Sequence, residues 1–316
     1  MASSSLTEGK SSYTIQVYHD ARIKDNVATS GNGGGIYFNS SLNKNIPVTF
    51  KIFERTDNGV RHIPQITGNH ADSGKGGGIY YEITASARKD IHSIFLDGGN
   101  ISGNYAIYGA GVYSAGGDVN CSENVNGVLM TGNTASVDGG ALFLEGGSLT
   151  MNSGDVSSNM ATSNGGGLYI GSGGFLTMNS GTVSGNTATV DGGGVYIASD
   201  GSLTMNGSTI TSNTSGGNGG GIYLDTPRSF IMNAGEVSRN SVGIDKKGGG
   251  ICCVASTQES ESTNSVVLNG GLVSGNIANG DAQFTGGGNI HHIVTRGQNA
   301  HIFQILRTGQ QFAVQH

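Results

Sequence analysis

Two carboxylates in the middle of the chain have a spacing that acid–base chemistry could use. Asp138 and Asp191 stand at equivalent points of a repeating pattern, two repeats apart, with Asn164 at the same point between them. If successive repeats stack as strands do, the two carboxylates lie about 9.6 Å apart, which is compatible with an inverting glycoside hydrolase. Other repeats hold lysine or asparagine at this point, and such residues before Gly-Gly are ordinary in turns. We therefore predict no catalytic residue and keep a polysaccharide-active enzyme, lyase or hydrolase, as an alternative.

Metal and thiol chemistry have weaker support. His291 and His292 are adjacent, so in a strand they point to opposite faces and cannot share one ion. The three cysteines have no zinc-type spacing, because Cys252 and Cys253 are neighbours and Cys121 lies far away. Cys121 falls at an inward position of the repeat, which predicts a buried, unreactive thiol. We predict no metal site and no cofactor.

An almost unbroken column of aromatic residues is the sharpest feature that could bind a ligand. One aromatic residue follows an aliphatic residue after each glycine cluster, at Tyr37, Tyr80, Tyr113, Phe143, Tyr169, Tyr196 and Tyr223. Alternation places these rings on the outer face, where a flat aromatic strip could stack against sugars or another partner with an apolar face. Stacking of the rings on one another to stabilise a sheet is the alternative reading. The strip is our candidate binding site.

A second column consists of asparagines. An apolar residue, two small or polar residues and then Asn recur nine times, at Asn26, Asn69, Asn104, Asn133, Asn159, Asn186, Asn213, Asn240 and Asn276. Asn suits a turn after a strand because it tolerates the left-handed conformation and bonds nearby backbone. Stacked in register, the nine side chains could form an amide ladder.

The elements that must position these columns are short strands. From Asn159 to Asn240 the spacing is a strict 27 residues, and each period holds three segments with alternating apolar residues, each closed by Gly, Asn or Ser. Three strands per period without a helical segment predict one coil of a parallel β-helix. We expect an all-β, right-handed parallel β-helix of about nine three-strand coils over residues 23–292, with capping segments at 1–22 and 293–316. The longer spacings leave room for an excursion around Val48–Phe53 and for an insertion near residues 254–265.

Composition excludes several classes of protein. The chain has 57 glycines and 3 prolines in 316 residues, only 12% charged residues and a net charge of −6. Gly at this frequency is incompatible with a helical protein, and scattered Lys and Arg in an acidic chain predict no nucleic-acid partner. No apolar run approaches the length of a membrane-spanning helix, and the first ten residues contain no apolar segment of a secretory signal.

The combined repeat, apolar-x-x-Asn followed by Gly-Gly-Gly/Ala-aliphatic-Tyr, resembles the repeats of the polymorphic outer-membrane proteins. Those repeats are written GGA[ILV] and FxxN and occur in autotransporter-type adhesin passengers; Gly139–Leu142 matches the first literally. The resemblance implies a β-helix displayed at a bacterial cell surface, or secreted, that mediates adhesion. We therefore expect a non-catalytic adhesion or structural module whose partner is a glycan or a protein. A self-stacking fibre or stalk subunit is a further alternative, so the chain is expected to be a monomer or to assemble end to end.

Overall fold

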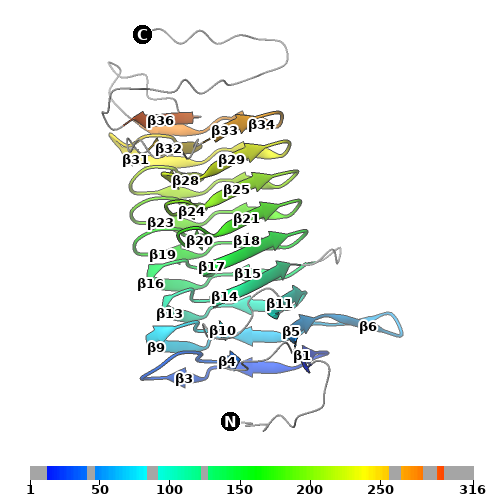
Figure 1. The fold of residues 1–316 in the computed structure, drawn as a ribbon. Helices are drawn as coiled ribbons and strands as arrows, with labels where there is room; N and C mark the ends of the chain where they lie inside the picture. The colour runs from blue at the N-terminus through cyan, green and yellow to red at the C-terminus, as the bar shows by residue number, and fades with distance from the viewer. Residues whose placement is uncertain are drawn as a thin grey trace.

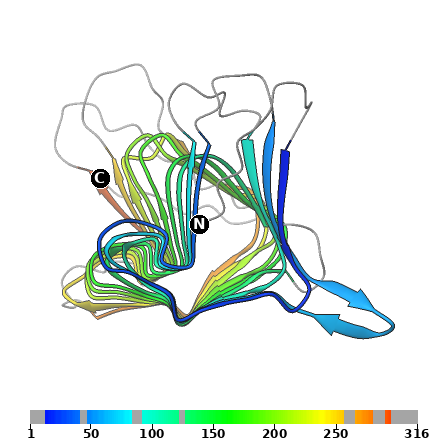
Figure 2. The same ribbon diagram turned by 90° about the horizontal axis from the view of Figure 1, so that it is seen from below.

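The computed structural model describes residues 13–40, 47–83, 92–121, 127–255, 265–279 and 290–294. These residues form a right-handed parallel β-helix, in which the chain winds upward through stacked coils from the N-terminal to the C-terminal end (Figure 1). Seen along its axis, the superposed coils outline three walls (Figure 2). The described residues include no helix long and apolar enough to cross a membrane.

Two of the three sheets contain one short strand from each of nine coils. The second sheet consists of β2 (Arg22–Lys24), β8 (Gln65–Thr67), β12 (Asn100–Ser102), β15 (Leu129–Thr131), β18 (Asp155–Ser157), β22 (Thr182–Ser184), β26 (Thr209–Thr211), β30 (Glu236–Ser238) and β34 (Leu272–Ser274). The third sheet consists of β3 (Val27–Ala28), β9 (His70–Lys75), β13 (Tyr105–Tyr108), β16 (Thr134–Asp138), β19 (Met160–Ala161), β23 (Thr187–Ala188), β27 (Thr214–Ser215), β31 (Ser241–Ile244) and β35 (Ile277–Asn279).

The remaining wall, the main sheet, has 16 strands because most coils cross it as two strands. One half contains the aromatic positions and comprises β4 (Ile36–Ser40), β10 (Ile79–Ile83), β20 (Leu168–Ile170), β24 (Val195–Ile197), β28 (Ile222–Asp225), β32 (Ile251–Ala255) and β36 (Ile290–Val294). The other half comprises β1 (Tyr13–Tyr18), β5 (Val48–Phe53), β11 (His92–Asp97), β21 (Phe175–Met178), β25 (Ser202–Met205), β29 (Ser229–Met232) and β33 (Ser265–Leu268). The ten-residue strands β14 (Val112–Cys121) and β17 (Leu142–Met151) run through both halves and join them.

The core fills the interior of the solenoid because apolar residues return to the same inward positions in every coil. In β21 the side chains of Leu176 and Met178 are buried and Thr177 between them is half-buried, as alternation predicts. Parallel pairing places each inward side chain on its equivalent in the next coil, for example Leu176 on Leu203. Cys121 lies in this core with no exposed surface, and burial raises the pKa of its thiol to about 12. The prediction that this thiol is buried is confirmed.

The first coils differ from the expectation in two places. Val48–Phe53 is no excursion: it is strand β5, which pairs with both β1 and β11 and buries alternate side chains. The true excursion is the antiparallel hairpin of β6 (Arg55–Asp57) and β7 (Val60–His62), which projects from the wall in Figure 2. Asn58 and Gly59 both have positive φ in its turn, the geometry of a tight two-residue hairpin.

The ends of the repeat domain also extend further than the sequence pattern indicated. β1 lies within the predicted N-terminal cap, residues 1–22, but pairs along its whole length with β5. It therefore belongs to the main sheet. At the other end β36 continues to Val294. Residues 1–12, 256–264 and 295–316, which hold most of the predicted caps and of the second insertion, lie outside the described residues.

Candidate functional site

The nine asparagines form one continuous ladder at the corner between the second and third sheets. In the central coils the Oδ1 atom of Asn186 accepts from the backbone N–H and from Nδ2 of Asn159, both at 2.9 Å. Nδ2 of Asn186 in turn donates to Asn213 Oδ1 and to the backbone oxygen of Val156, both at 2.9 Å. Every donor and acceptor of the amide is thus used. The same bonds recur from Asn69 to Asn240, and these side chains are at most 1% exposed.

The local sequence makes this corner possible. The residue before each ladder asparagine has a positive φ, between 55° and 66°, whereas the asparagines themselves do not. The prediction that Asn adopts the left-handed conformation is therefore wrong: the preceding residue turns the chain, so the asparagine points inward. The last residue of the glycine cluster packs on the ladder in most coils, and it is glycine at Gly35, Gly78, Gly111, Gly167, Gly194 and Gly221. A Cβ atom on Gly194 would lie 2.9 Å from Nδ2 of Asn213 and 2.7 Å from the oxygen of Gly221, so a side chain here needs a small shift of its neighbours. Ala141 stands at the equivalent position two coils earlier.

A second, shorter ladder occupies the turn that holds the candidate catalytic carboxylates. Oδ1 of Asp138 accepts from the backbone N–H of Asn164 at 2.8 Å and from its Nδ2 at 3.1 Å. Asn164 Oδ1 accepts a hydrogen bond from the backbone N–H of Asp191 at 3.1 Å. In the next coil the backbone N–H and Nδ2 of Asn218 both donate to Oδ1 of Asp191. Burial raises the pKa of Asp191. These carboxylates therefore act as acceptors for the backbone of the next coil, which is the turn chemistry that the sequence favoured over catalysis.

The aromatic column is stacked from coil to coil. Successive ring centroids lie 4.4–5.5 Å apart from Tyr37 to Tyr223, and successive ring planes differ by at most 14°. Each inner ring consequently has both faces covered by its neighbours. The strip presents ring edges and hydroxyls to the outside, and not the flat faces that the sequence analysis expected for stacking on sugars.

Exposure along the aromatic column is uneven. Tyr37 at the N-terminal end is 55% exposed, but Tyr80 and Tyr113 are only 5% and 1% exposed. Lys75 Nζ donates to Tyr113 Oη at 2.6 Å, and that hydroxyl donates to Glu145 at 2.7 Å. Tyr80 and Tyr113 are thus part of the packed structure and are not available to a partner.

The C-terminal half of the column is accessible over four successive coils. Phe143, Tyr169, Tyr196 and Tyr223 are half-buried. Burial, together with the carboxylates of Asp138 and Asp225, raises the pKa of Tyr169 to about 12. Its hydroxyl therefore stays protonated at neutral pH and can donate a hydrogen bond. We name Tyr169, Tyr196 and Tyr223 the tyrosine edge.

The column continues past Tyr223 with Cys252 on β32 and His291 on β36, as the sequence indicated. Cys252 is fully buried, and burial raises the pKa of its thiol to about 12. The side chains of His291 and His292 lie outside the described residues. All three cysteines are free.

The comparison with family models finds one match. The Chlamydia polymorphic membrane protein repeat matches residues 207–225. This segment runs from the turn before β26 to the end of β28, and so includes ladder residue Asn213, the cluster Gly219–Gly221 and Tyr223. The match covers one repeat, which agrees with the resemblance seen in the sequence and with the β-helix. Searches of curated proteins and of solved structures found no match.

Two features escaped the sequence analysis. A third ladder runs along the outside of the other corner, through Asn152, Asn179, Asn206, Asn233 and Asn269. Its 27-residue spacing was visible, but nothing in the residue type separates an exposed ladder from a buried one. The other feature is a cluster of His19, Asp57 and His62 at the base of the hairpin. The Asn58-Gly59 pair signalled the hairpin, but the approach of His19 depends on the pairing of β1 with β5.

Proposed function

We propose that this chain is a non-catalytic module of a bacterial cell-surface protein of the autotransporter type, which presents the tyrosine edge to a glycan or protein partner. The observation that carries the proposal is the accessible row of stacked tyrosines on a continuous solenoid wall. The match to a membrane-protein repeat at residues 207–225 supports the surface location. The involvement of Asp138 and Asp191 in turn hydrogen bonds favours a binding role over hydrolysis.

The geometry of the tyrosine edge favours recognition through hydroxyls. Ring stacking at 4.9 and 5.2 Å fixes the three hydroxyls in a row with the repeat of the coils. Burial raises the pKa of Tyr196, and the nearby carboxylates of Asp225 and Asp191 raise it further. A partner would therefore meet hydrogen-bond donors beside negative charge, which suits the hydroxyls of a glycan or a basic segment of a protein.

A binding experiment with matched variants tests this proposal. The purified chain is applied to an array of glycans and host-surface proteins, beside a variant with Tyr169, Tyr196 and Tyr223 changed to Phe. This triple change removes three hydroxyls and keeps the stacked rings. The control changes Thr150, Thr177 and Thr204 to Ala, because these outward residues form an equivalent row on the other half of the main sheet.

We expect a partner that the control binds and the Phe variant does not. Equal binding by all three proteins would move the interaction away from the tyrosine edge, toward the hairpin or the insertion near residues 254–265. Filaments formed by the intact chain, with no bound partner, would favour the fibre subunit. Release of sugar ends from a polysaccharide would favour the enzyme.

A further inference from the structure

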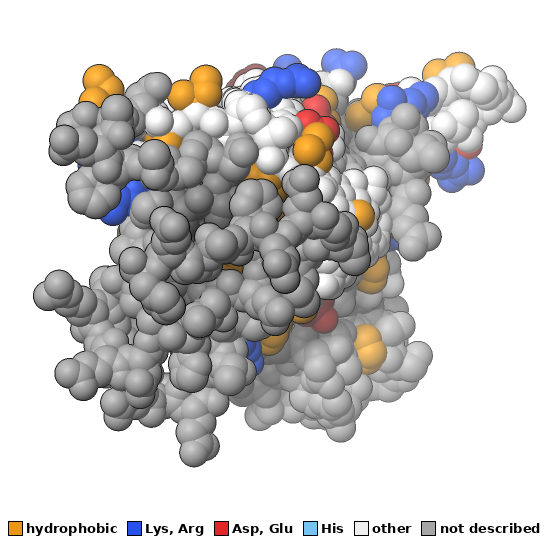
Figure 3. All heavy atoms as spheres, turned by 90° about the horizontal axis from the view of Figure 1, so that it is seen from above, with side chains coloured by type: hydrophobic (Ala, Val, Ile, Leu, Met, Phe, Trp, Pro, Cys, Tyr) orange, Lys and Arg blue, Asp and Glu red, His pale blue; other side chains and the backbone are white. Residues whose placement is uncertain are grey.

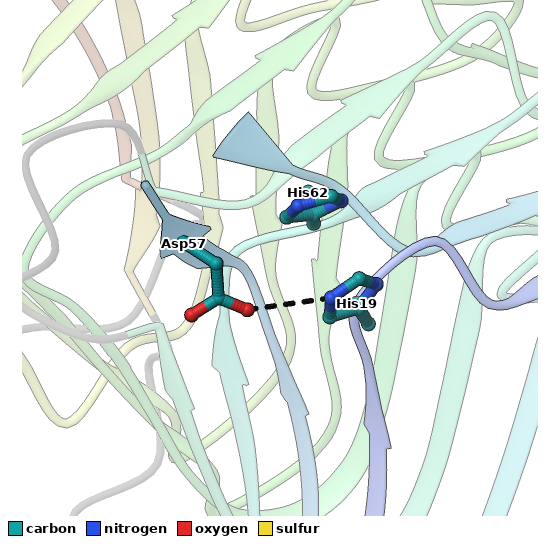
Figure 4. A group of neighbouring side chains, drawn as sticks. All are labelled: His19, Asp57 and His62. Atoms are coloured by element: carbon teal, nitrogen blue, oxygen red, sulfur yellow. Dashed lines mark ion pairs between the residues drawn. The ribbon is translucent and has the colours of Figure 1, made fainter. Parts of the chain in front are cut away.

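The base of the hairpin brings together imidazole and carboxylate groups from two distant segments. His19 follows β1, whereas Asp57 and His62 lie on the two strands of the hairpin. One donor atom from each of the three residues lies within 4.8 Å of the others. Nε2 of His19 is 3.3 Å from Oδ2 of Asp57, and the two imidazole rings stack with centroids 3.8 Å apart (Figure 4).

We propose that His19, Asp57 and His62 bind a zinc ion that fastens the hairpin to the first coil of the solenoid. Imidazole nitrogen and carboxylate oxygen are ordinary zinc ligands. A tetrahedral ion with bonds of about 2.0–2.1 Å separates its ligand atoms by about 3.3–3.4 Å. The His19–Asp57 distance already has this value. The ligand atom of His62 lies within 4.8 Å of the other two, and the His62 ring must turn out of its stack on His19 to complete three of four positions. Water takes the fourth.

Asp20 orients the His62 imidazole for a metal. One oxygen of its carboxylate lies 2.6 Å from Nδ1 of His62 and 3.6 Å from Nδ1 of His19. The short contact to His62 holds a proton on its Nδ1 and leaves its Nε2 with a free lone pair, the form that binds zinc.

The backbone conformation and the neighbouring charges also support a metal site at these three residues. His19 has a φ of 61°, a conformation that non-glycine residues adopt rarely and that often marks functional sites. The hairpin register pairs Arg55 with His62 and Asp57 with Val60, which places Asp57 and His62 on one face. Arg55 Nε donates a hydrogen bond to Oδ1 of Asp57 at 2.7 Å, so the other carboxylate oxygen, Oδ2, faces His19.

The other surfaces of the described residues offer weaker evidence for a binding site. Seen from the C-terminal end, the hydrophobic side chains of the described residues show as small separate groups and form no continuous patch on the visible face (Figure 3). Among the described residues, His19, Asp57 and His62 form the one group of three or more potential metal ligands.

Zinc titration with hairpin proteolysis tests the proposal. Because the chain has eight histidines, binding alone does not locate the ion. Zinc binding is measured by calorimetry on the full chain, on the double variant H19A/H62A, on Asp20→Asn and on the control His70→Ala. The His70 imidazole lies 3.6 Å from Asp72 and packs against Tyr105, away from the hairpin. Trypsin cleavage after Arg55 and Arg61 reports opening of the hairpin.

We expect one zinc ion per chain in the parent and in the His70 control, and loss of that ion in the double variant. Asp20→Asn should weaken binding by about 10–100-fold. At a zinc concentration 100 times the dissociation constant, cleavage after Arg55 and Arg61 should slow by about 100-fold. Absence of zinc binding by the parent, a retained ion in the double variant, or unchanged cleavage on adding zinc would overturn the proposal. The changed side chains lie outside the core, and far-UV circular dichroism checks that each variant is folded.

Discussion

In the central coils the buried and the exposed asparagine ladders use the same residue at the same 27-residue spacing, yet they differ in every contact that affects stability. In the buried ladder each Oδ1 accepts two hydrogen bonds and each Nδ2 donates two, including one to a backbone oxygen. In the exposed ladder only single bonds between side chains are formed, as from Asn179 Nδ2 to Asn152 Oδ1 at 2.7 Å. The two chains of amides also run in opposite directions along the axis.

Burial, and not residue type, is what makes one ladder a structural element. A buried amide without partners costs about 1–3 kcal/mol per group, so the inner ladder must be complete. Water replaces any bond that the outer ladder loses. We therefore expect the same substitution to have very different consequences at the two corners.

The largest effect is expected from replacing a buried ladder amide by a carboxylate. Asn186→Asp keeps the shape but places an oxygen against the oxygens of Val156 and Asn213, which Nδ2 of Asn186 now contacts. It should lower the free energy of unfolding by about 3–5 kcal/mol. Asn179→Asp, the matched change in the exposed ladder, should cost no more than about 0.5 kcal/mol. Urea denaturation of both variants makes the comparison, and equal losses would contradict it.

A smaller loss is expected where glycine packs on the buried ladder. Gly194→Ala adds a Cβ atom against Nδ2 of Asn213 and the oxygen of Gly221, and should cost about 1 kcal/mol, because Ala141 at the equivalent position shows that a small shift accommodates the methyl group. Gly146→Ala is the control, because its added Cβ would meet no atom within 4 Å and its φ is not positive. If both variants unfold at the same urea concentration, the close approach of Gly194 to the ladder contributes nothing to stability.

A small gain is expected at the turn that precedes the ladder. Ser212 has a φ of 58° before Asn213, a conformation that costs a non-glycine residue about 1–2 kcal/mol. Ser212→Gly removes this cost at the expense of about 0.5–1 kcal/mol of chain entropy. A net gain of about 0.5 kcal/mol should raise the melting temperature measured by calorimetry. A lower melting temperature would show that the Ser212 side chain contributes more than its backbone costs.

The smallest effect is expected in the turn ladder, which is intermediate in burial. Burial raises the pKa of Asp191, so the folded state holds this proton more strongly than the unfolded state does. The stability that results is present below the ordinary carboxyl pKa and is lost as pH rises through the folded pKa. Asp191→Asn should therefore raise stability at neutral pH by about 0.5 kcal/mol or less, and the difference should vanish in acid. Thermal unfolding at several pH values measures it, and a variant that is less stable at neutral pH would refute the assignment.

Much of the architecture could be predicted from the sequence because every coil of a solenoid places the same residue types at the same positions. The inward aliphatic positions, the asparagine column and the nine coils follow from period and alternation. The strand Val48–Phe53 was mistaken for an excursion because its pairing partner β1 lies outside the recognisable repeat. Repetition cannot identify a strand that does not repeat.

The candidate site was less predictable. Alternation put the aromatic residues outside, but whether a ring shows its face or its edge depends on the coil spacing and side-chain tilt, and neither is encoded in residue type. The burial of Tyr80 and Tyr113 depends on other coils, as the bonds of Lys75 and Glu145 to Tyr113 show. The contact of His19 with His62 likewise needs the first two coils in register.

Hydrogen exchange of the asparagine side-chain amides, followed by NMR on the intact chain, tests the central comparison most directly. The account predicts that the Nδ2 protons of Asn159, Asn186 and Asn213 exchange only when the solenoid opens, orders of magnitude more slowly than those of Asn179 and Asn206. Similar exchange rates for the two groups would contradict the claim that burial alone makes one ladder part of the core.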